Sequence, residues 1–558
     1  MNHDSQLTSG RSAFLQLLID EGITHLFGNP GTTELPIMHA LPDHPELTYV
    51  LGLQESIVVA MADGFSRASG QLVACNVHVA PGLGNAMGSL FNAHFTGTPM
   101  ILTAGQHEQG HGLTEPMLYN PLTPIAEPLV KWAVEVSRLE DLPRIVRRAA
   151  KIATTPPTGP VFLSLPGDIL NAEASIDLGA STRVDARSRP CDDALEAVAD
   201  RLLAARSPVL VCCDELVKSD ALSEAAELAE VLGSPAYQQS VPYGAHFLSE
   251  HPCYLGALSR DQKQVHDILA KHDLLLMLGG DGLRMSVWSE VDPLPAGMPV
   301  IHLGHLDWEM DKNFPVETAL RADLRETLRA LIPILREKGG APLAERAGAA
   351  MAQLKTANWS AKRARLADTL SAEKSNGRPI DADFLMLRVA EALPRDAIVV
   401  NEGLTAGTRL PELVPYRDRY GYHGLASGGI GWGIAAAVGV QLAHPERPVY
   451  AVIGDGSAMY SIQALWTAAH LKLPLTYVIP NNGGYRILKQ RLLAFHGDDR
   501  FIGMDLEDPR IDFAALARSL GVTAEKVTEP AQIDPALARA FANSGPNLIE
   551  VAVDGRVG

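Results

Sequence analysis

The stretch Gly454–Tyr485, GDGSAMYSIQALWTAAHLKLPLTYVIPNNGGY, decides the fold of this chain. It begins directly after the apolar run Val449–Ile453 and contains a second such run, Leu475–Ile479. Residues 458–471 lie between the two runs and have a helix-forming composition with apolar residues spaced by three and four. A strand, a helix and a second strand in this order form a crossover. The two strands are therefore predicted to be parallel and to end at the same edge of a sheet.

Polar residues stand at both predicted strand ends. Asp455 follows the first strand and Asn482 follows the second. A carboxylate, a side-chain amide and turn carbonyls form an oxygen site that suits Mg²⁺, and Gly456 and Ser457 begin a helix whose first amides can hold phosphates. Taken alone, the GDG triplet is usually a polar turn in an ordinary strand–helix–strand unit. The asparagine pair at the matching strand end favours a metal and phosphate site.

The composition is that of a large globular enzyme. The chain has 558 residues, which is too long for one hydrophobic core and suggests about three domains. Apolar residues make up 46% of the chain and charged residues 20%, which is ordinary for such a protein. The net charge of −18 argues against nucleic acid or an anionic membrane as a partner. It does not exclude an anionic substrate, because local cations decide that.

Cysteine usage and the N-terminus predict a cytoplasmic protein. The five cysteines are scattered and show no metal-binding spacing, as expected in a reducing compartment. Residues 1–12 contain no basic region followed by an apolar run, so no signal peptide is expected. Residues 422–444 are uncharged and long enough to suggest a membrane span, but their glycine and alanine content favours a buried helix.

Residues 1–185 form a first block in which predicted strands and helices alternate. The strands are expected at 25–28, 49–53, 72–79, 100–104 and 161–166, with helices including 10–21 and 56–69. This alternation predicts a doubly wound parallel sheet, whose ligand site lies beyond the carboxyl ends of its strands.

Three polar features gather at this predicted edge: the pair Thr32–Thr33, then Glu55, then His78. Each also has a purely structural interpretation. A carboxylate at a helix start is favoured by the helix dipole, and a histidine near a strand end is often a core residue bonded to backbone. His107 and His111, in the loop GQHEQGHG, resemble a metal-binding pair. Without a third ligand, an ordinary or active-site loop is the better interpretation.

Two further blocks follow. Residues 190–335 predict a Rossmann-like central domain, although the turn GGDG at 279–282 does not match a dinucleotide-binding motif. Residues 336–378 are charged and predict a linker with an exposed helix. Residues 379–558 form the third block, in which the glycine-rich turn 428–431 leads into a predicted helix before the opening stretch. The fold expected for the whole chain is α/β, with three doubly wound parallel-sheet domains.

With these residues in hand, nearly the whole chain resembles the decarboxylase and carboligase branch of thiamine diphosphate enzymes. It is most similar to benzoylformate decarboxylases, with acetolactate synthases further off. Besides GDG followed by NN, the resemblance is carried by FGNPGTTELP (27–36), LQES (53–56), NVHVAPGLGNAMGSL (76–90), GGIGWGIAAAVGVQLA (428–443) and GDGSAMYSIQALWTAA (454–469). It implies a pyrimidine-binding domain, a central domain and a diphosphate-binding domain. It also implies a cofactor held between two subunits, so that a homodimer is the minimum and a homotetramer is usual.

The resemblance also implies thiamine diphosphate and Mg²⁺ as cofactors and assigns roles to residues. Glu55 resembles the carboxylate that activates the aminopyrimidine ring of the cofactor, and its apolar flank is consistent with a dry site. His78 resembles the histidine that carries protons in the reaction. Thr32 falls where a serine holds the substrate carboxylate. The implied metal ligands are Asp455, Asn482 and the carbonyl of Gly484, and the implied cofactor contacts are Thr405, Gly428, Ile430 as a bulky support, Gly456, Ser457 and Tyr485.

Two departures from the family pattern concern the substrate pocket. A second catalytic histidine of benzoylformate decarboxylases aligns near Ser286, so half of the proton relay is either absent or supplied from elsewhere, with His107 and His111 as the candidates. After the asparagine pair, Ile487 is expected to narrow the pocket. Arg486, Lys489 and Arg491 add positive charge there, which either faces a second anionic group or forms a solvated helix face. Benzoylformate as the substrate is therefore in doubt.

The leading interpretation is a decarboxylase of a small-molecule 2-oxo acid, giving an aldehyde and CO₂, with carboligase side activity. An acetolactate synthase-like carboligase or a 2-hydroxyacyl-CoA lyase is the alternative within the same chemistry. A cofactor-binding but inactive regulatory protein is the alternative of another class, and Glu55 argues against it. A nicotinamide dehydrogenase ranks third. The sequence leaves open whether the central domain binds FAD or another nucleotide.

Overall fold

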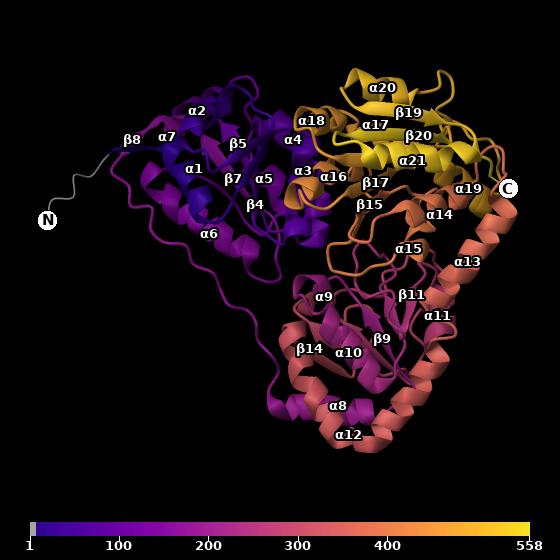
Figure 1. Cartoon of the computed structure of the whole chain (residues 1–558). Coiled ribbons are helices and arrows are strands. Elements are labelled where there is room, and N and C mark those ends of the chain that lie inside the picture. The colour runs from indigo at the N-terminus through magenta and orange to yellow at the C-terminus, as the bar shows by residue number, and fades with distance from the viewer. Residues whose placement is uncertain (1–6, 558) are drawn as a thin grey trace.

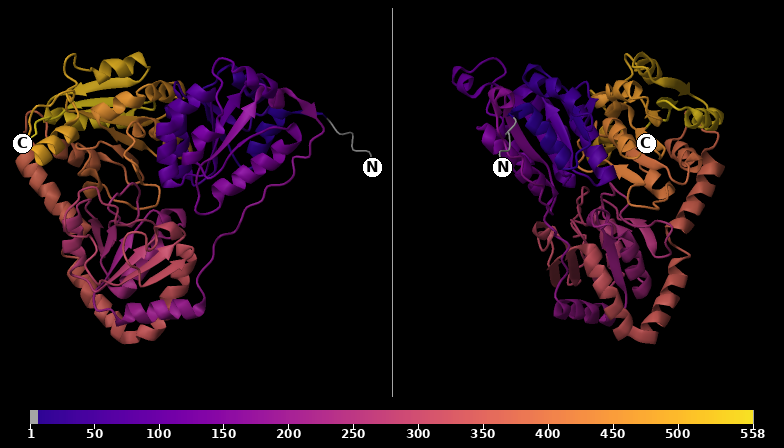
Figure 2. Two further views of the ribbon diagram at one scale, coloured as in Figure 1. Left: turned by 180° about the vertical axis from the view of Figure 1, so that it is seen from behind. Right: turned by 60° about the vertical axis from the view of Figure 1, so that its left-hand side comes forward.

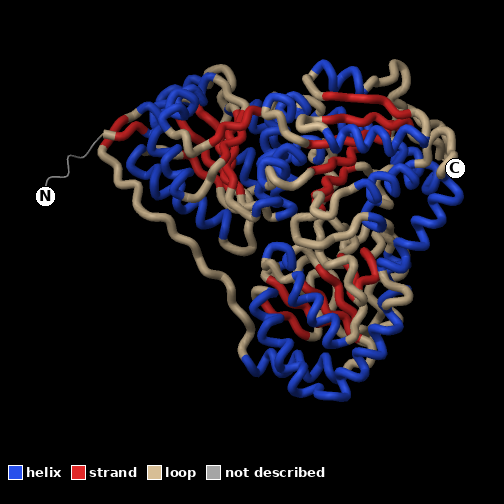
Figure 3. Tube along the Cα trace, in the orientation of Figure 1, coloured by secondary structure: helices blue, strands red, loops and turns tan. Residues whose placement is uncertain are grey.

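The structure, a computed structural model, describes residues 7–557 and contains three parallel six-stranded sheets flanked by helices (Figures 1 and 3). The expected α/β fold with three parallel sheets is confirmed. In spatial order, the first sheet consists of β3 (Thr48–Leu51), β2 (His25–Gly28), β4 (Val73–Val77), β5 (Met100–Gln106), β7 (Val161–Pro166) and β6 (Ala133–Glu135). The second consists of β11 (Tyr254–Ala257), β10 (Ala236–Gln238), β9 (Pro208–Cys212), β12 (Leu274–Leu278), β13 (Val300–Gly304) and β14 (Thr318–Arg321). The third consists of β16 (Tyr422–Gly424), β15 (Ile398–Glu402), β17 (Val449–Ile453), β18 (Leu475–Asn481), β20 (Asn547–Ala552) and β19 (Thr523–Val527). A short antiparallel pair joins β1 (Thr8–Ser9) to β8 (Glu173–Ala174).

Helices connect the strands within each unit. The first unit has α1 (Gly10–Asp20), α2 (Leu35–Ala40), α3 (Glu55–Ser69), α4 (Val79–Thr96), α5 (Thr123–Ala126), α6 (Leu142–Thr154) and α7 (Gly167–Asn171). The second has α8 (Asp192–Ala204), α9 (Glu215–Lys218), α10 (Leu222–Leu232) and α11 (Gln262–Leu269). The third has α14 (Ala382–Ala392), α15 (Leu410–Leu413), α16 (Gly433–Ala443), α17 (Asp455–Ser461), α18 (Ala464–His470), α19 (Arg486–His496), α20 (Phe513–Ser519) and α21 (Ile533–Ala542).

The central crossover forms as the sequence pattern predicts, because β17 and β18 are parallel neighbours with Val449 opposite Leu475. The helical segment between these two strands differs from the prediction. Residues 458–471 were expected to form one helix, but the structure has α17 and α18 with a break between them. At the break, Ser461 Oγ donates to the carbonyl of Gly431 at 2.5 Å. No glycine or proline marks this break, so the sequence pattern does not reveal it.

Two connections link the units in space (Figures 1 and 2). An extended segment, residues 175–191, runs from the first unit to the second. The long helix α12 (Leu324–Leu354), which bends at Gly340, and α13 (Trp359–Lys374) return from the second unit to the third. Residues 336–378, expected to be a linker with an exposed helix, are thus mostly helical. Trp359 anchors α13, since its indole nitrogen donates to the carbonyl of Pro411 at 3.2 Å.

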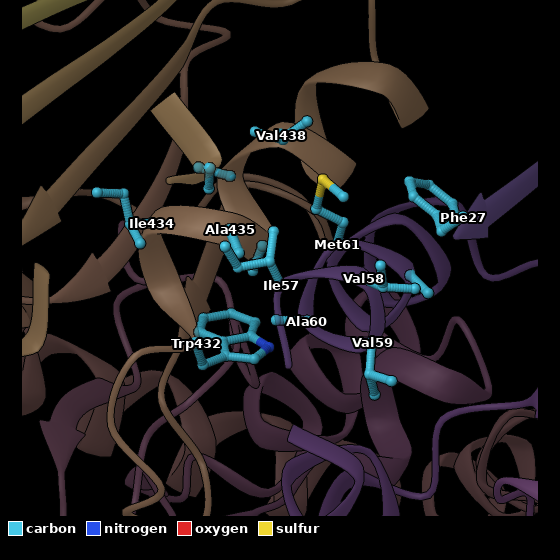
Figure 4. Packing of buried hydrophobic residues seen from close by; sticks show 14 of the residues in the cluster. Phe27, Ile57, Val58, Val59, Ala60, Met61, Trp432, Ile434, Ala435 and Val438 are labelled. Atoms are coloured by element: carbon cyan, nitrogen blue, oxygen red, sulfur yellow. The ribbon is translucent and has the colours of Figure 1, made fainter. Parts of the chain in front are cut away.

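The first and third units share a hydrophobic core (Figure 4). Helix α3 packs against α16 so closely that a Cβ at Gly64 would lie 2.3 Å from the carbonyl oxygen of Ala436. Buried Asp63 accepts a hydrogen bond from the indole nitrogen of Trp432 at 2.6 Å. Because this contact joins the helix that begins at Glu55 to the turn that precedes α16, the packing positions both.

No helix within residues 7–557 is both long and apolar enough to cross a membrane. Residues 422–444 instead form β16, a turn and the buried helix α16.

Candidate active site

The ends of β17 and β18 form one oxygen-lined cradle. Asp455 is 3% exposed, and its carboxylate accepts backbone hydrogen bonds from Gly456 at 2.9 Å, Gly483 at 2.8 Å and Gly484 at 3.2 Å. The side-chain oxygen of Asn482 accepts from the same Gly484 amide at 3.1 Å. Burial raises the pKa of Asp455, while these backbone amides oppose the rise. The structure therefore brings Asp455, Asn482 and Gly484 together around one turn, and their oxygens are the donor type that Mg²⁺ prefers.

Gly456 and Ser457, in the first turn of α17, adjoin these oxygens. A Cβ at Gly456 would lie 2.7 Å from the ring of Tyr485, so only glycine lets this ring close over the turn. The Ser457 hydroxyl is buried near Glu402 but makes no hydrogen bond of good geometry within residues 7–557. Buried hydroxyls are normally paired. An oxygen-rich group of a cofactor, such as a diphosphate, would supply the missing partner.

Glu402, at the end of β15, holds the glycine-rich turn that carries Ile430. Its carboxylate accepts the amides of Gly431 at 2.5 Å and of Gly433. Burial raises the pKa of Glu402 to about 7, against the lowering effect of these amides. Gly431 has φ 94°, and a Cβ there would lie 2.4 Å from Tyr460 Cβ, so glycine is required by both conformation and space.

The other expected contacts of the third unit lie around this turn. Gly428, with φ 84°, stands two residues before the half-buried Ile430. Thr405 is half-buried in the turn after β15. The structure places both turns beside the carboxyl ends of neighbouring strands, where ligands bind in parallel sheets.

Glu55 begins α3 and is 8% exposed. Its carboxylate accepts a hydrogen bond from the side-chain amide of Asn85 at 3.0 Å, and a Cβ at Gly82 would lie 3.0 Å from it. Among the described residues, its side-chain hydrogen bond stays within the first unit. Oε2 of Glu55 is thus engaged, whereas Oε1 accepts no hydrogen bond from residues 7–557.

His78 is paired with a carboxylate that the sequence analysis did not single out. Glu34 is fully buried, and its Oε2 lies 2.7 Å from Nδ1 of His78. Since an ionised carboxylate only accepts hydrogen bonds, Nδ1 carries a proton and Nε2 remains for a substrate. Glu34 itself is held by the amides of Gly31 at 2.9 Å and Gly105 at 2.8 Å.

The backbone around His78 is tightly constrained. Val79 has φ 41°, which is rare for a β-branched residue and typical of strain retained at functional sites. Gly31 lies against the imidazole, so that a Cβ there would be 2.1 Å from Nδ1. Thr33, rather than Thr32, contacts His78, with its hydroxyl 3.1 Å from Nδ1. Thr32 is exposed at the start of a short 3-10 helix.

Four residues were expected to line the substrate pocket: Thr32, His78, Ser286 and Ile487. Two of them, Ser286 and Ile487, are exposed to solvent in one chain. Ser286 is exposed in the loop after β12, where its amide donates to the carbonyl of Arg260 at 3.1 Å. Ile487 is 37% exposed in the first turn of α19.

His107 and His111 acquire a third neighbour in the structure. The ligand atoms of His107, Glu108 and His111 all lie within 4.8 Å of one another. The expectation of an ordinary loop rested on the lack of such a third group, and the sequence HEQGH in fact contains it. Glu108 and His111 are exposed, and the Nε2 of His107 is already 3.0 Å from the carbonyl of Met117.

A cavity of about 680 Å³ lies where the three units meet. Glu215, at the edge of this cavity, lies at the carboxyl end of the central sheet. Its carboxylate accepts hydrogen bonds from the backbone amides of Gly280 at 2.8 Å and His305 at 2.5 Å. Strand-end amides are the groups that hold dinucleotide phosphates in doubly wound domains. In this chain the Glu215 carboxylate occupies two such amides, those of Gly280 and His305.

Comparison with known proteins covers all three units. Models of the N-terminal, central and C-terminal domains of thiamine pyrophosphate (thiamine diphosphate) enzymes match residues 8–118, 195–331 and 411–551. Benzoylformate decarboxylase of Pseudomonas aeruginosa is 35% identical over 97% of this chain and 98% of that protein. The acetolactate synthase large subunit of Haemophilus influenzae is 26% identical over 96% of this chain and 92% of that protein.

A solved structure agrees with these similarities. Thiamine diphosphate-dependent 4-hydroxybenzoylformate decarboxylase of Rhodococcus jostii RHA1 has a TM-score of 0.86 and 32% identity, and the match covers 98% of this chain and 99% of that one. The chain therefore belongs to the thiamine pyrophosphate enzyme family, and it is a thiamine diphosphate-dependent enzyme similar to benzoylformate decarboxylases.

Proposed function

We propose that this chain is a Mg²⁺-dependent, thiamine diphosphate-dependent decarboxylase that converts a 2-oxo acid into an aldehyde and CO₂. We further propose that it ligates the same acyl unit to an aldehyde acceptor as a side activity. The observation that carries the proposal is the hydrogen bond between His78 and Glu34, which holds His78 in place. Release of an aldehyde requires a positioned group that delivers a proton, and His78 is such a group. The similarity to benzoylformate decarboxylases supports the same reaction class.

The cradle at the third sheet fits the cofactor. Its oxygens suit Mg²⁺, and the Ser457 hydroxyl, which has no hydrogen bond of good geometry among residues 7–557, suits a phosphate oxygen. The residues proposed to hold the metal are Asp455, Asn482 and Gly484, and those proposed to hold the cofactor are Thr405, Gly428, Ile430, Gly456, Ser457 and Tyr485. When bound, thiamine diphosphate would supply a carbon nucleophile for the substrate carbonyl and a cationic ring that accepts the electron pair left when CO₂ departs.

The chain's own residues supply the rest of the chemistry. Glu55, which is almost completely buried, would hold a proton at a ring nitrogen of the bound cofactor. His78 Nε2 gives a proton to the carbon that loses CO₂, with Glu34 fixing its orientation. Thr32 orients the substrate carboxylate through its hydroxyl.

We also propose that the active unit is at least a homodimer and commonly a homotetramer. Large apolar side chains remain exposed on α4 and α17, namely Phe91 at 43%, Met459 at 40% and Tyr460 at 57%. Covering them with a second copy would remove apolar surface beside the cradle from water. Light scattering should give twice or four times the chain mass, and a stable monomer that retains activity would contradict this assembly.

The experiment that tests the function is a panel of 2-oxo acids assayed for CO₂ and aldehyde with Mg²⁺ and thiamine diphosphate. At least one acid should be decarboxylated. Glu55→Gln should lower kcat by about 100-fold or more, since proton transfer contributes factors of this size. Cofactor binding should persist in this variant, as measured by calorimetry. Failure to release CO₂ from any acid would reject the proposed function, and an unimpaired Glu55→Gln enzyme would reject the role of Glu55.

A further inference from the structure

The loop that follows β5, residues 107–119, is fixed where it leaves and rejoins the body of the first unit. Gln106, the last residue of β5, donates from its side-chain amide to the carbonyl of Asn120 at 3.0 Å, and its side-chain oxygen accepts from the His107 amide at 3.0 Å. Further along the loop, Leu113 is 93% exposed. The loop therefore has a firm base beside the sheet and an exposed tip.

Three groups that can bind a metal gather at this base. The ligand atoms of His107, Glu108 and His111 all lie within 4.8 Å of one another. A short 3-10 helix, Gln109–Thr114, brings them together, because the His111 amide donates to the Glu108 carbonyl at 2.9 Å and turns the chain back on itself. His107 is half-buried, whereas the side chains of Glu108 and His111 are exposed and can change rotamer.

The spacing of these three atoms suits an ion of the size of Zn²⁺. An ion at the centre of three atoms 4.8 Å apart lies about 2.8 Å from each, and zinc bonds to nitrogen and oxygen are about 2.0–2.2 Å long. Each ligand atom therefore has to move by less than about 1 Å to bind the ion. Rotations of the two exposed side chains cover such a distance without a change in the backbone.

The surroundings of His107 match those of a metal-bound imidazole. Its Nε2 lies 3.0 Å from the carbonyl oxygen of Met117. A carbonyl only accepts hydrogen bonds, so in the neutral ring Nε2 carries the proton and Nδ1 keeps an electron pair for a ligand bond. Metal-binding histidines usually donate their second ring nitrogen to a backbone carbonyl or a carboxylate in this way, which fixes the direction of the ring.

Glu108 is placed by the start of α7. A Cβ at Gly167 would lie 3.4 Å from Oε1 of Glu108, and the neighbouring Gln109 amide donates to the carboxylate of Asp168 at 3.4 Å. One carboxylate and two neutral imidazoles form a site with a single negative charge, which suits a dication. Mixed nitrogen and oxygen ligands favour Zn²⁺ and similar transition metals over Mg²⁺, which prefers oxygen alone.

We propose that Nδ1 of His107, the carboxylate of Glu108 and the imidazole of His111 bind one transition-metal dication of the zinc type, with water in the remaining position. The metal closes the base of the loop directly after β5, the strand whose Gly105 amide holds Glu34 at 2.8 Å. Metal binding thus stiffens the chain next to the carboxylate that orients the proposed proton carrier. An imidazole bound to a metal is not available as a proton carrier, so this role replaces the proton relay for both histidines. The inference does not depend on the proposed function.

Titration calorimetry with ZnCl₂ tests the site in protein that has been loaded with Mg²⁺ and thiamine diphosphate and freed of unbound cofactor. The wild type should bind one equivalent of Zn²⁺ that His111→Asn and Glu108→Gln each bind at least about 10-fold more weakly. Even residues that only support metal ligands contribute about 10- to 100-fold to metal affinity, so a ligand itself should contribute no less. His496→Asn removes an exposed imidazole at the end of α19, and Cys191→Ser removes the exposed thiol. These two controls should bind Zn²⁺ as the wild type does.

Two further measurements separate a built site from loose binding to surface groups. Co²⁺ should give the wild type the intense visible absorption of four-coordinate cobalt, whereas cobalt on scattered surface groups stays six-coordinate and absorbs faintly. Amide hydrogen exchange in residues 107–119 should slow when Zn²⁺ is added to the wild type and should not slow in His111→Asn.

The outcomes keep this inference apart from the proposed function. Absence of Zn²⁺ binding, equal affinity in the wild type and either loop variant, faint cobalt absorption, or unchanged hydrogen exchange would each overturn the metal site. Failure of every 2-oxo acid to release CO₂ would reject the proposed function and leave the metal site standing.

Discussion

The orientation of His78 depends on a single buried carboxylate. Glu34 has its two oxygens occupied by the imidazole, two backbone amides and the Thr33 hydroxyl, so it has little freedom to move. A group with this many fixed partners holds the imidazole in one tautomer and one direction. We regard Glu34 as a positioning residue that acts through His78.

Replacing this carboxylate should affect turnover more than substrate binding. Glu34→Gln keeps the shape but loses the charge that holds the Nδ1 proton, and we expect kcat to fall by about 10- to 1000-fold with KM changed by less than about threefold. Steady-state kinetics and nitrogen-15 NMR of the imidazole measure the two effects. Glu46→Gln, at an exposed site, is the control. An unchanged imidazole spectrum in Glu34→Gln would contradict the assigned role.

Glu402 makes stability depend on pH. Its pKa is about 7 in the folded chain, because burial raises it from the ordinary value of 4.5. Between pH 4.5 and 7 the unfolded chain loses this proton first, so the folded state is progressively disfavoured as pH rises. The full cost is about 3 kcal/mol above pH 7, and it is absent below pH 4.5.

The corresponding measurement compares the apo wild type with Glu402→Gln by thermal unfolding at several pH values. The difference in melting temperature, wild type minus variant, should fall between pH 5 and 7. A difference that stays constant or rises over this range would show that Glu402 is ionised throughout.

The sequence identified residues that lie next to their own motifs and missed residues whose role comes from distant contacts. Asp455 and Asn482 were predicted to come together because a crossover fixes where parallel strands end, whereas Gly484 was implied by the family resemblance. In the structure both side chains accept a hydrogen bond from the Gly484 amide. Glu34 was missed because its partners, His78 and Gly105, are 44 and 71 residues away. In sequence it stands before Leu-Pro and resembles an ordinary helix-starting acid.

Among the elements, the α3–α16 contact links the first and third units. Gly439 on α16 faces the backbone of α3, where a Cβ would lie 1.9 Å from the carbonyl oxygen of Met61. Backbone atoms cannot move aside as a flexible side chain can. Glycine at this position is therefore required by the close approach of two helices.

Gly439→Ala should destabilise the protein by about 1 to 3 kcal/mol or more, the usual range for overpacking. Gly348→Ala, on the exposed face of α12 with no atom within 4 Å, should be neutral or slightly stabilising, because alanine favours helices. Melting temperatures compare the two variants directly. Equal melting temperatures would show that α3 and α16 are not packed as described.

The strands that the sequence analysis missed are mostly at sheet edges. β6, β11, β14, β16 and β19 are edge strands. The strands that the sequence predicts, which in the second and third units include 208–213, 273–278, 300–303, 398–401 and 547–553, are mostly central and fully buried. Central parallel strands are continuous apolar runs, which a sequence displays clearly. An edge strand such as β14 alternates between half-buried and exposed residues and is too short to show a period.

At the scale of the whole molecule, three similar sheets have different tasks. The first carries Glu55 and His78, the third carries the oxygen cradle, and Glu215 fills the end of the second. The shared core of the first and third units fixes how they face each other within one chain. We propose that a second copy covers the exposed apolar side chains on α4 and α17.

The central claim is that the ends of β17 and β18 bind Mg²⁺ and the diphosphate of thiamine diphosphate. Titration calorimetry of the purified protein with thiamine diphosphate, in Mg²⁺ and then in excess chelator, tests it most directly. We predict saturable binding in Mg²⁺ that weakens by about 100-fold or more in chelator, and a similar loss for Asp455→Ala in Mg²⁺. Absence of binding in Mg²⁺, or equal binding by the wild type and Asp455→Ala, would contradict the account.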